Sequence, residues 1–288
     1  MVTPAIIADQ LTYNYEKVKA VDHINFQVAK GEILSFLGPN GAGKTTTVKM
    51  LTGQLHPQEG KATLLGMDVV KETEKVQARI GVCFEITNLY EQMSAIENLN
   101  LFAKLFGVKD FDAEAALKRI GLDGRGKDRV ETYSKGMKQR LMVARSLINK
   151  PDILFLDEPT EGLDPVSAET IRNIILEERA RGATVFLTTH DMVEADKLSD
   201  RVAFIDQGEI AALDTPHNLK QKYGKRAIKV QVAGPDGKLV SKEIFLDEPG
   251  TADSMRELFS EEQVITLHSE EATLEDIFIQ ITGRGLAG

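Results

Sequence analysis

The feature that most constrains this chain is an apolar strand that runs directly into a glycine-rich loop and then into a helix. The strand EILSFL, residues 32–37, is nearly all apolar, as strands buried on both faces of a parallel sheet are. It is followed by GPNGAGKT and by the helical run TTVKMLTG. The residues that fit the spacing G-x-x-x-x-G-K-[ST] are Gly38, Gly43, Lys44 and Thr45. In this context they predict a loop whose backbone N–H groups cradle phosphates, which leaves kinases, GTPases and ATPases open.

Two carboxylates are candidates for the chemistry beside this loop. Asp157 and Glu158 end a second apolar strand, ILFLDE, at the edge of the sheet where α/β proteins bind ligands. Because successive side chains on a strand diverge, we expect Asp157 to hold Mg²⁺ and Glu158 to polarise an attacking water. In the loop itself, we expect Lys44 to reach the β and γ phosphates and the Thr45 hydroxyl to bind Mg²⁺.

The elements around these strands predict an α/β core with a parallel sheet. Residues 5–37 are expected to form three short strands, with AKGE as the turn between the last two. A helix from about 165 to 181, with Asp164 as its N-cap and Gly182 just past its end, separates ILFLD from a third apolar strand, ATVFLTTH. Strands that alternate with helices are typical of this fold class.

Two further regions are expected outside the core strands. Residues 88–150 predict a mostly helical insertion, whose first helix has Ser94 and Glu97 in capping-box spacing. Its broad apolar face is usually core, but part of it is a candidate docking surface for another helix. Residues 221–288 predict a small α+β domain with a GPDG turn and a last helix, TLEDIFIQIT. We therefore expect two domains, 1–220 and 221–288.

Composition excludes several kinds of protein. The chain has 35 basic and 44 acidic residues, a net charge of −9, so no nucleic-acid partner is expected. The basic clusters at 124–129 and 220–226 lack interleaved aromatic residues and are interpreted as solvated surface. The single cysteine, Cys83, excludes an internal disulfide and is expected to be a small buried hydrophobe. No stretch reaches the about 18 apolar residues of a spanning helix, so we expect any membrane-crossing part to be another chain.

Five segments, in this order along the chain, carry a family resemblance. They are GPNGAGKTT, YSKGMKQR (133–140), ILFLDE, GLD (162–164) and TTHD around His190. They resemble, in turn, the phosphate loop, signature motif, Walker B strand, D-loop and switch histidine of ABC transporter ATP-binding subunits. The resemblance covers residues 1 to about 220. It implies a P-loop NTPase core of the ABC type with an antiparallel β subdomain and a helical insertion, and two ATP molecules sandwiched between two such subunits.

The resemblance also implies a set of site residues, with ATP as the nucleotide and Mg²⁺ as the metal. The catalytic residues would be Glu158, His190 and Lys44. The residues expected to contact ATP are Tyr15, Gly38, Pro39, Asn40, Gly41, Ala42, Gly43, Lys44, Thr45, Thr46, Glu85, Ser134, Lys135, Gly136 and Asp164. Those expected to hold Mg²⁺ are Thr45, Asp157 and Glu85.

Three of these residues have specific roles by the same resemblance. Tyr15 would stack on the adenine, with Tyr13 as its competitor for that role. His190 would contact the γ-phosphate and orient the water. Asp164 would act across the dimer interface and also cap the next helix.

The sequence departs from the family pattern at two positions. Glu85, in GVCFEITN, stands where the family usually has a glutamine that links Mg²⁺ to the membrane subunit. Glutamate keeps the acceptor oxygen but adds a charge, which either binds the metal more firmly or repels the γ-phosphate. Lys135 stands where the commonest signature motif has glycine. With Ser134 as N-cap, Lys135 and Gly136 would open a helix and form an anion receptor; the alternative is that Lys135 points to solvent.

The tail narrows the expected function. ATLEDIFIQITG resembles ATPase subunits paired with ABC-2-type permeases, a group with many drug, antibiotic and sodium exporters. We expect an ATP-hydrolysing subunit that dimerises on ATP, with a second copy or a paralogue, and drives a separate permease at the cytoplasmic face of the membrane. A soluble ABC ATPase acting in translation or on DNA is one alternative, but the chain has a single ATPase core. A regulatory nucleotide-binding module is another, but Glu158 and His190 are both present.

Overall fold

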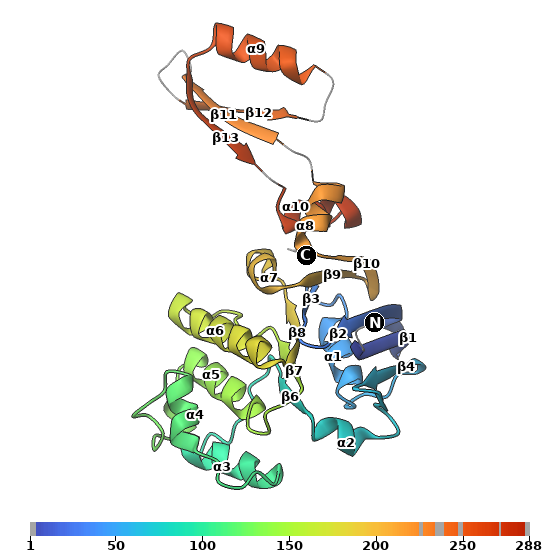
Figure 1. Cartoon of the computed structure of the whole chain (residues 1–288), viewed down its shortest axis with the longest axis vertical. Helices are drawn as coiled ribbons and strands as arrows, with labels where there is room; N and C mark the ends of the chain where they lie inside the picture. The colour runs from blue at the N-terminus through green and yellow to red at the C-terminus, as the bar shows by residue number, and fades with distance from the viewer. Residues whose placement is uncertain (1–3, 225–226, 234–238, 247–249, 271, 286–288) are drawn as a thin grey trace. The chain divides into compact units, whose positions relative to one another are not determined.

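The computed structural model describes residues 4–224, 227–233, 239–246, 250–270 and 272–285. These residues form two compact units, the larger up to Leu213 and the smaller from Asp214 onward (Figure 1). The GPDG turn expected at 234–237 lies outside the described residues. Among the residues described, we find no helix with the length and apolar character needed to span a bilayer.

A six-stranded sheet forms the centre of the larger unit, in the order β10-β9-β3-β8-β7-β6. The strands are β3 (Ile33–Leu37), β6 (Ile80–Cys83), β7 (Ile153–Asp157), β8 (Thr184–Thr189), β9 (Arg201–Asp206) and β10 (Glu209–Asp214). The strands β3 and β7 both run parallel to β8, and Phe36 and Asp157 are both in register with Thr188. The carboxyl ends of these three strands therefore meet at one edge of the sheet.

A second, antiparallel sheet has the order β2-β1-β4-β5. Its strands are β1 (Pro4–Tyr15), β2 (Val18–Ala29), β4 (Glu59–Leu64) and β5 (Met67–Asp68). The prediction of short strands over 5–37 is confirmed by β1, β2 and β3. The β1–β2 hairpin turns at Glu16 and Lys17, next to the expected adenine-stacking residue Tyr15.

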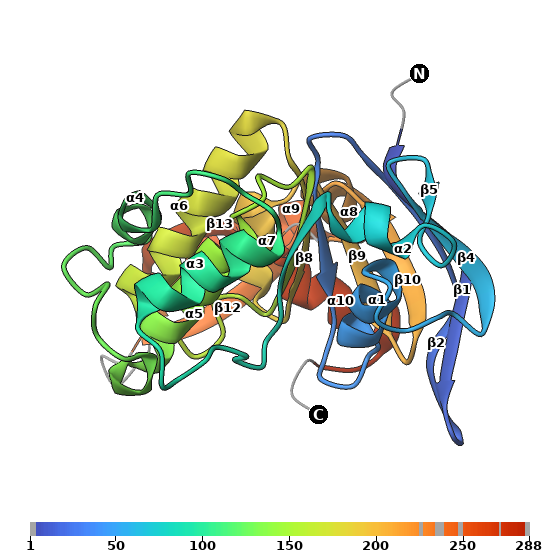
Figure 2. The same ribbon diagram turned by 90° about the horizontal axis from the view of Figure 1, so that it is seen from below.

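Helices lie on both faces of the central sheet, with α1 and α2 in the core that it shares with the antiparallel sheet. They are α1 (Lys44–Leu51), α2 (Thr73–Gln77), α3 (Ala95–Leu105), α4 (Ala113–Arg119), the 3₁₀ turn η1 (Val130–Thr132), α5 (Lys135–Ser146), α6 (Pro165–Arg181) and α7 (Met192–Leu198). In Figure 2, α3 to α6 lie on one side of β8, and α1, α2, β1, β2 and β4 lie on the other. The segment expected as a helical insertion contains α3, α4 and α5.

The predicted helix ends are confirmed where local chemistry sets them. Ser94 and Glu97 form a capping box at the start of α3. Asp164 caps α6 by accepting a hydrogen bond from the Ser167 N–H, and Gly182 ends the helix with a φ of 99°. The broad apolar face of α3 is only partly core, because Leu105 and Phe106 at its C-terminal end are exposed.

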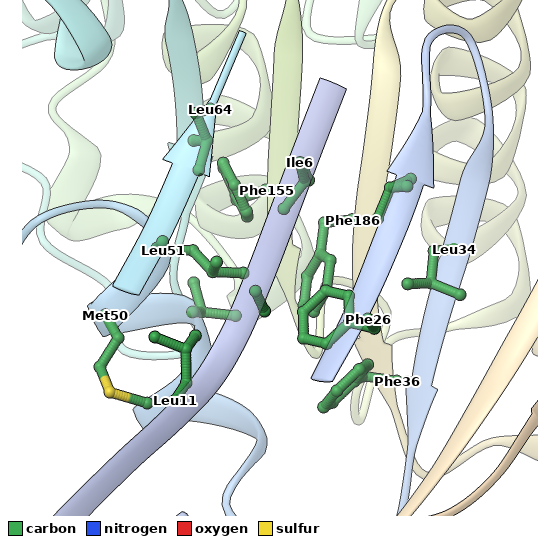
Figure 3. Packing of buried hydrophobic residues seen from close by; sticks show 14 of the residues in the cluster. Ile6, Leu11, Phe26, Leu34, Phe36, Met50, Leu51, Leu64, Phe155 and Phe186 are labelled. Atoms are coloured by element: carbon green, nitrogen blue, oxygen red, sulfur yellow. The ribbon is translucent and has the colours of Figure 1, made fainter. Parts of the chain in front are cut away.

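Two hydrophobic cores explain why the central strands are apolar throughout. Alternate side chains of β3 point to opposite faces, so Leu34 and Phe36 join the core between the two sheets while Ile33 joins the core under the helices. Figure 3 shows the first core, where Phe186 lies among other aromatic rings. Its ring centroid is 5.1 Å from that of Phe36 and 5.7 Å from that of Phe155.

The smaller unit combines a three-stranded antiparallel sheet with three helices. The elements are α8 (Pro216–Tyr223), β11 (Ala227–Ala233), β12 (Leu239–Phe245), α9 (Thr251–Glu261), β13 (Val264–Glu270) and α10 (Leu274–Thr282). The sheet order is β12-β11-β13. Leu258 of α9 packs on Val230 and Val232 of β11, and α10 begins with a capping box of Thr273 and Asp276. Helix α8, which was not among the expected elements, contacts α10.

Candidate functional site

Glycines fix the shape of the loop between β3 and α1. A Cβ on Gly38 would lie 2.1 Å from the carbonyl oxygen of Ile205, and a Cβ on Gly43 would lie 2.3 Å from that of Ala20. Gly43 also has a φ of 108°, which L side chains rarely adopt. The loop backbone therefore lies against both sheets at a distance that only glycine allows.

Lys44 is held inside this loop. Its side chain is 6% exposed, and its ammonium donates to the carbonyl oxygens of Gly38, at 2.6 Å, and Pro39, at 3.2 Å. The same Nζ lies 3.1 Å from Oε1 of Glu158. The predicted loop lysine and the predicted catalytic carboxylate are thus direct neighbours.

A cavity of about 420 Å³ opens beside the loop. It is lined by Tyr15, Val18, Ala20, Pro39, Asn40, Gly41, Ala42, Gly43, Lys44, Thr45, Thr46, Glu85 and Glu158. Val18 and Ala20 are the lining residues that the sequence did not indicate; both follow the β1–β2 turn, so only the pairing of these strands brings them to the loop. A concave site with backbone N–H groups on one wall and an aromatic ring on another suits a nucleotide.

Of the two tyrosines considered for stacking on the adenine, only Tyr15 lines the cavity. Tyr13 is partly buried and packs against the core between the sheets. Tyr15 is 43% exposed and lines the cavity. The two rings meet edge to face with their centroids 4.8 Å apart, so Tyr13 supports the ring of Tyr15 from behind.

Asp157 is fully buried at the end of β7. One of its oxygens, Oδ1, accepts a hydrogen bond from the Thr188 hydroxyl, while Oδ2 has no hydrogen-bond partner among the described residues. Burial raises the pKa of Asp157, and the Thr188 and Thr45 hydroxyls counteract that rise. A buried carboxylate oxygen left free beside a threonine hydroxyl is a suitable pair of ligands for Mg²⁺, which keeps its other positions for phosphate oxygens and water.

Glu158 is held in a strained conformation between Lys44 and His190. Its φ is 47°, a left-handed value that is uncommon for a residue with a Cβ. Its N–H donates to the carbonyl oxygen of Thr188 at 3.0 Å, and its Oε2 lies 3.0 Å from Nδ1 of His190. The carboxylate therefore faces Lys44 with one oxygen and His190 with the other. Thr188, which fixes both carboxylate residues, was not predicted; its only signal was its place in the segment TTHD.

Glu85 lies at the rim of the cavity and is exposed. Partial burial raises the pKa of Glu85, and the nearby negative charges of Glu161, Asp157 and Glu158 add to that rise, while Lys44 opposes it. Glu85 therefore lies in the electrostatic field of the carboxylates at the end of β7, although the described residues contain no cluster of three acidic or histidine side chains positioned to hold a metal ion.

The remaining predicted residues lie together outside the cavity. Ser134 caps α5 by accepting a hydrogen bond from the Met137 N–H at 3.2 Å. Lys135 is exposed, and its Nζ lies over Gly162, only 2.7 Å from where a Cβ of that glycine would be. Gly136 packs against the side chains of Asp164 and Ser167. The signature segment and the D-loop therefore adjoin one another, and none of their residues lines the cavity.

Comparison with known proteins places this geometry in a family. The sequence model described as "ABC transporter" matches residues 21–161. The fluoroquinolones export ATP-binding protein of Mycobacterium tuberculosis is 44% identical over 286 residues, which are 99% of this chain and 95% of that protein. The bacitracin transport ATP-binding protein BcrA of Bacillus licheniformis is 33% identical and shares 96% of this chain and 97% of its own length.

A solved structure agrees with the fold of the larger unit. The dimeric ATP-binding cassette MJ0796, in a post-hydrolysis state with ADP and Pi, matches with a TM-score of 0.66 and 25% identity. The match covers 73% of this chain and 98% of that one. The prediction of a P-loop NTPase fold of the ABC type is confirmed.

Replacing Gly43 by alanine should distort the phosphate loop. The new Cβ would meet the Ala20 carbonyl oxygen and keep an unfavourable φ, so we expect ATP to bind at least about tenfold more weakly, by titration calorimetry. Gly66→Ala is the matched control, because Gly66 has a φ of 83° but open space around it and lies outside the cavity. Equal ATP affinities in the two variants would contradict the assignment of the loop.

Proposed function

We propose, from the premise that this chain belongs to the ABC transporter family, that it is the ATPase subunit of an exporter and drives a separate membrane permease. The chain binds and hydrolyses ATP as a member of this family. The observation that carries the proposed mechanism is the position of Glu158 between Lys44 and His190, at 3.1 and 3.0 Å.

In our proposal, different residues of the cavity bind different parts of the nucleotide. The loop from Gly38 to Thr46 would hold the phosphates through its N–H groups, with the Lys44 ammonium on the β and γ phosphates. The exposed ring of Tyr15 would stack on the adenine. The described residues that line the cavity belong to the proposed ATP-binding domain, 1–220, which is followed by the proposed α+β domain, 221–288.

Thr45 and Asp157 would hold Mg²⁺, with Glu85 as a further carboxylate at the rim. The free, buried Oδ2 of Asp157 supports this assignment. When bound, Mg²⁺ neutralises charge that develops on the β and γ phosphate oxygens. The hydrogen bond from the Thr188 hydroxyl to the other Asp157 oxygen supports this role, because it holds the carboxylate in one orientation.

Glu158 and His190 would act on the attacking water. The Glu158 carboxylate would accept a proton from the water as the water oxygen bonds to the γ-phosphorus. The bond between the γ-phosphorus and the oxygen that bridges it to the β-phosphate breaks, and ADP leaves. His190 holds the second Glu158 oxygen through its ring Nδ1 and its backbone N–H, at 3.0 and 3.3 Å. Its other ring nitrogen is then available to the γ-phosphate. The Lys44 ammonium beside Glu158 would exchange the carboxylate for the phosphate when ATP enters.

Dimerisation would complete the site. The cavity carries the phosphate loop but not Ser134, Lys135 or Gly136, which lie on another surface of the same unit. We propose that these residues and Asp164 contact the ATP held by a second subunit, either a copy of this chain or a paralogue. The dimeric state of the related ATP-binding cassette supports this proposal.

The relatives support a proposal for the partner and for the direction of transport. The fluoroquinolones export and bacitracin transport proteins match nearly the whole of this chain, so the smaller unit is shared as well as the ATPase core. We propose export of a drug, antibiotic, ion or lipid-like substrate through an ABC-2-type permease, with the subunit held peripherally at the cytoplasmic face of the membrane. The alternatives, a non-transport ABC ATPase or a regulatory module, receive no support from these relatives.

Glu158→Gln tests the catalytic assignment. Removing the base should lower the ATPase rate by roughly 10²–10⁴-fold while ATP binding is kept. Steady-state phosphate release and equilibrium ATP binding measure the two effects. Glu177→Gln, an exposed carboxylate that pairs with Arg119, is the control and should keep the parent rate. A Glu158→Gln protein that hydrolyses at the parent rate would remove Glu158 from the mechanism.

Ser134→Arg tests the shared site. In the Glu158→Gln background, where ATP persists, we expect the arginine to spare ATP binding by the single subunit and to abolish ATP-driven dimerisation, measured by light scattering after gel filtration. Ser94→Arg is the matched control, since it also removes an N-cap serine but at α3. ATP-driven dimers of the Ser134→Arg protein would overturn the proposed role.

Glu85→Gln tests the departure from the family pattern. The variant should bind ATP normally but need more Mg²⁺ for half-maximal hydrolysis, because one carboxylate is lost from the rim of the cavity. Magnesium titrations of the ATPase rate measure this, with Glu91→Gln as a surface control. An unchanged rate and an unchanged Mg²⁺ dependence would exclude Glu85 from the site.

A further inference from the structure

A buried carboxylate outside the cavity connects two of the loops described above. Glu194 lies in the first turn of α7, four residues after His190, and its side chain is 1% exposed. It is not among the residues that line the cavity. A fully buried carboxylate needs an explanation, since burial of the charged form is costly.

The carboxylate is bonded to the loop that follows β7. Its Oε2 accepts a hydrogen bond from the Thr160 hydroxyl at 2.6 Å. Thr160 lies between Glu158 and Asp164, in a turn where the Leu163 N–H donates to its carbonyl oxygen at 3.2 Å. The bond therefore joins the segment after β8, which carries His190, to the segment after β7, which carries Glu158 and the D-loop.

The other end of this connection is rigid. Asp191 caps α7 by accepting hydrogen bonds from the N–H groups of Val193 and Glu194, at 2.9 and 3.0 Å. Its own N–H donates to the Thr189 hydroxyl at 3.0 Å. The first turn of α7 and the His190 backbone are thus a single stiff segment, and a displacement of Glu194 displaces His190.

Stability alone does not account for this carboxylate. Its Oε1 has no hydrogen-bond partner among the described residues; Arg172 Nη1 is 3.6 Å away, and the same arginine is hydrogen-bonded to Glu169 at 2.8 and 3.0 Å. Burial raises the pKa of Glu194. An incompletely paired buried carboxylate is usually no more stabilising than an apolar side chain of similar size.

We infer that Glu194 is a positioning residue that couples the His190 segment to the Glu158–Asp164 loop through Thr160. The coupling keeps His190 aligned with Glu158 when the D-loop meets the second subunit. This inference rests on the roles proposed above for Glu158, His190 and Asp164. Changes at Thr160 and Glu194 should therefore alter the rate of ATP hydrolysis and leave the affinity for nucleotide unchanged.

Thr160→Val tests the inference with the smallest change, because valine has the shape of threonine without the donor. In the full-length protein, kcat for ATP should fall about tenfold, or about 1.4 kcal/mol in activation free energy. The Kd for ADP should stay at the parent value, whereas the thermal unfolding midpoint should fall, because an oxygen of the buried Glu194 carboxylate loses its hydrogen-bond donor. Thr160→Ser, which keeps the hydroxyl, should restore most of kcat.

Substitutions of Glu194 should also lower kcat, and combining them with Thr160→Val tests whether the two residues act through the same hydrogen bond. Glu194→Leu should lower kcat about as much as Thr160→Val without lowering the unfolding midpoint, and Glu194→Gln, which keeps an acceptor, should lose less. In the double variant of Thr160→Val and Glu194→Leu, the two losses should not multiply, because each single change already removes the same bond.

Three results would overturn the inference: an unchanged kcat in Thr160→Val, losses that multiply in the double variant, or a fall of kcat that is accompanied by weaker ADP binding. Such a failure is distinguishable from failure of the proposed function. In that second case the Glu158→Gln protein would itself hydrolyse ATP at the parent rate.

Discussion

The site depends on the pairing of two buried charges, Lys44 and Glu158. Both side chains are 6% exposed, and Nζ lies 3.1 Å from Oε1. A buried charge without its partner is strongly destabilising, so each residue makes the position of the other tolerable. They come from distant parts of the chain and meet because β3 and β7 are both parallel neighbours of β8. The strand order thus brings together the phosphate loop, the carboxylates and His190. The strained φ of Glu158 is maintained by its contacts with Lys44, Thr188 and His190.

Local signals in the sequence predicted most of the elements that hold this arrangement. The wholly apolar strand around Phe36 indicated burial on both faces, and the two hydrophobic cores on either side of β3 are the reason. The capping residues Ser94 and Asp164 fixed helix starts because they act on backbone groups three residues away. The glycine spacing of the phosphate loop indicated a cradle, and close backbone contacts now explain it.

Contacts between segments far apart in the chain could not be predicted in the same way. Thr188 fixes both Asp157 and Glu158 only because its register on β8 brings it opposite β7. The neighbour of Lys135 was left open between a phosphate and solvent; its ammonium lies over Gly162 of the D-loop, a contact that depends on the packing of α5 against α6. The bond between Thr160 and Glu194 has no sequence signature either, since nothing in the spacing of two loops reveals which of their side chains meet.

The close approach of the phosphate loop to both sheets has a thermodynamic consequence. Gly43 lies against the backbone at Ala20 on β2, and Gly38 lies against Ile205 on β9, so the loop keeps its shape only while both sheets are folded. Nucleotide binding and the integrity of the two sheets are therefore linked equilibria. ATP at about one hundred times its Kd would add about 2.7 kcal/mol to the free energy of unfolding of this unit. Unfolding of any strand that supports the loop would then have to overcome this additional free energy. The nucleotide then acts as a structural component of the larger unit as well as its substrate.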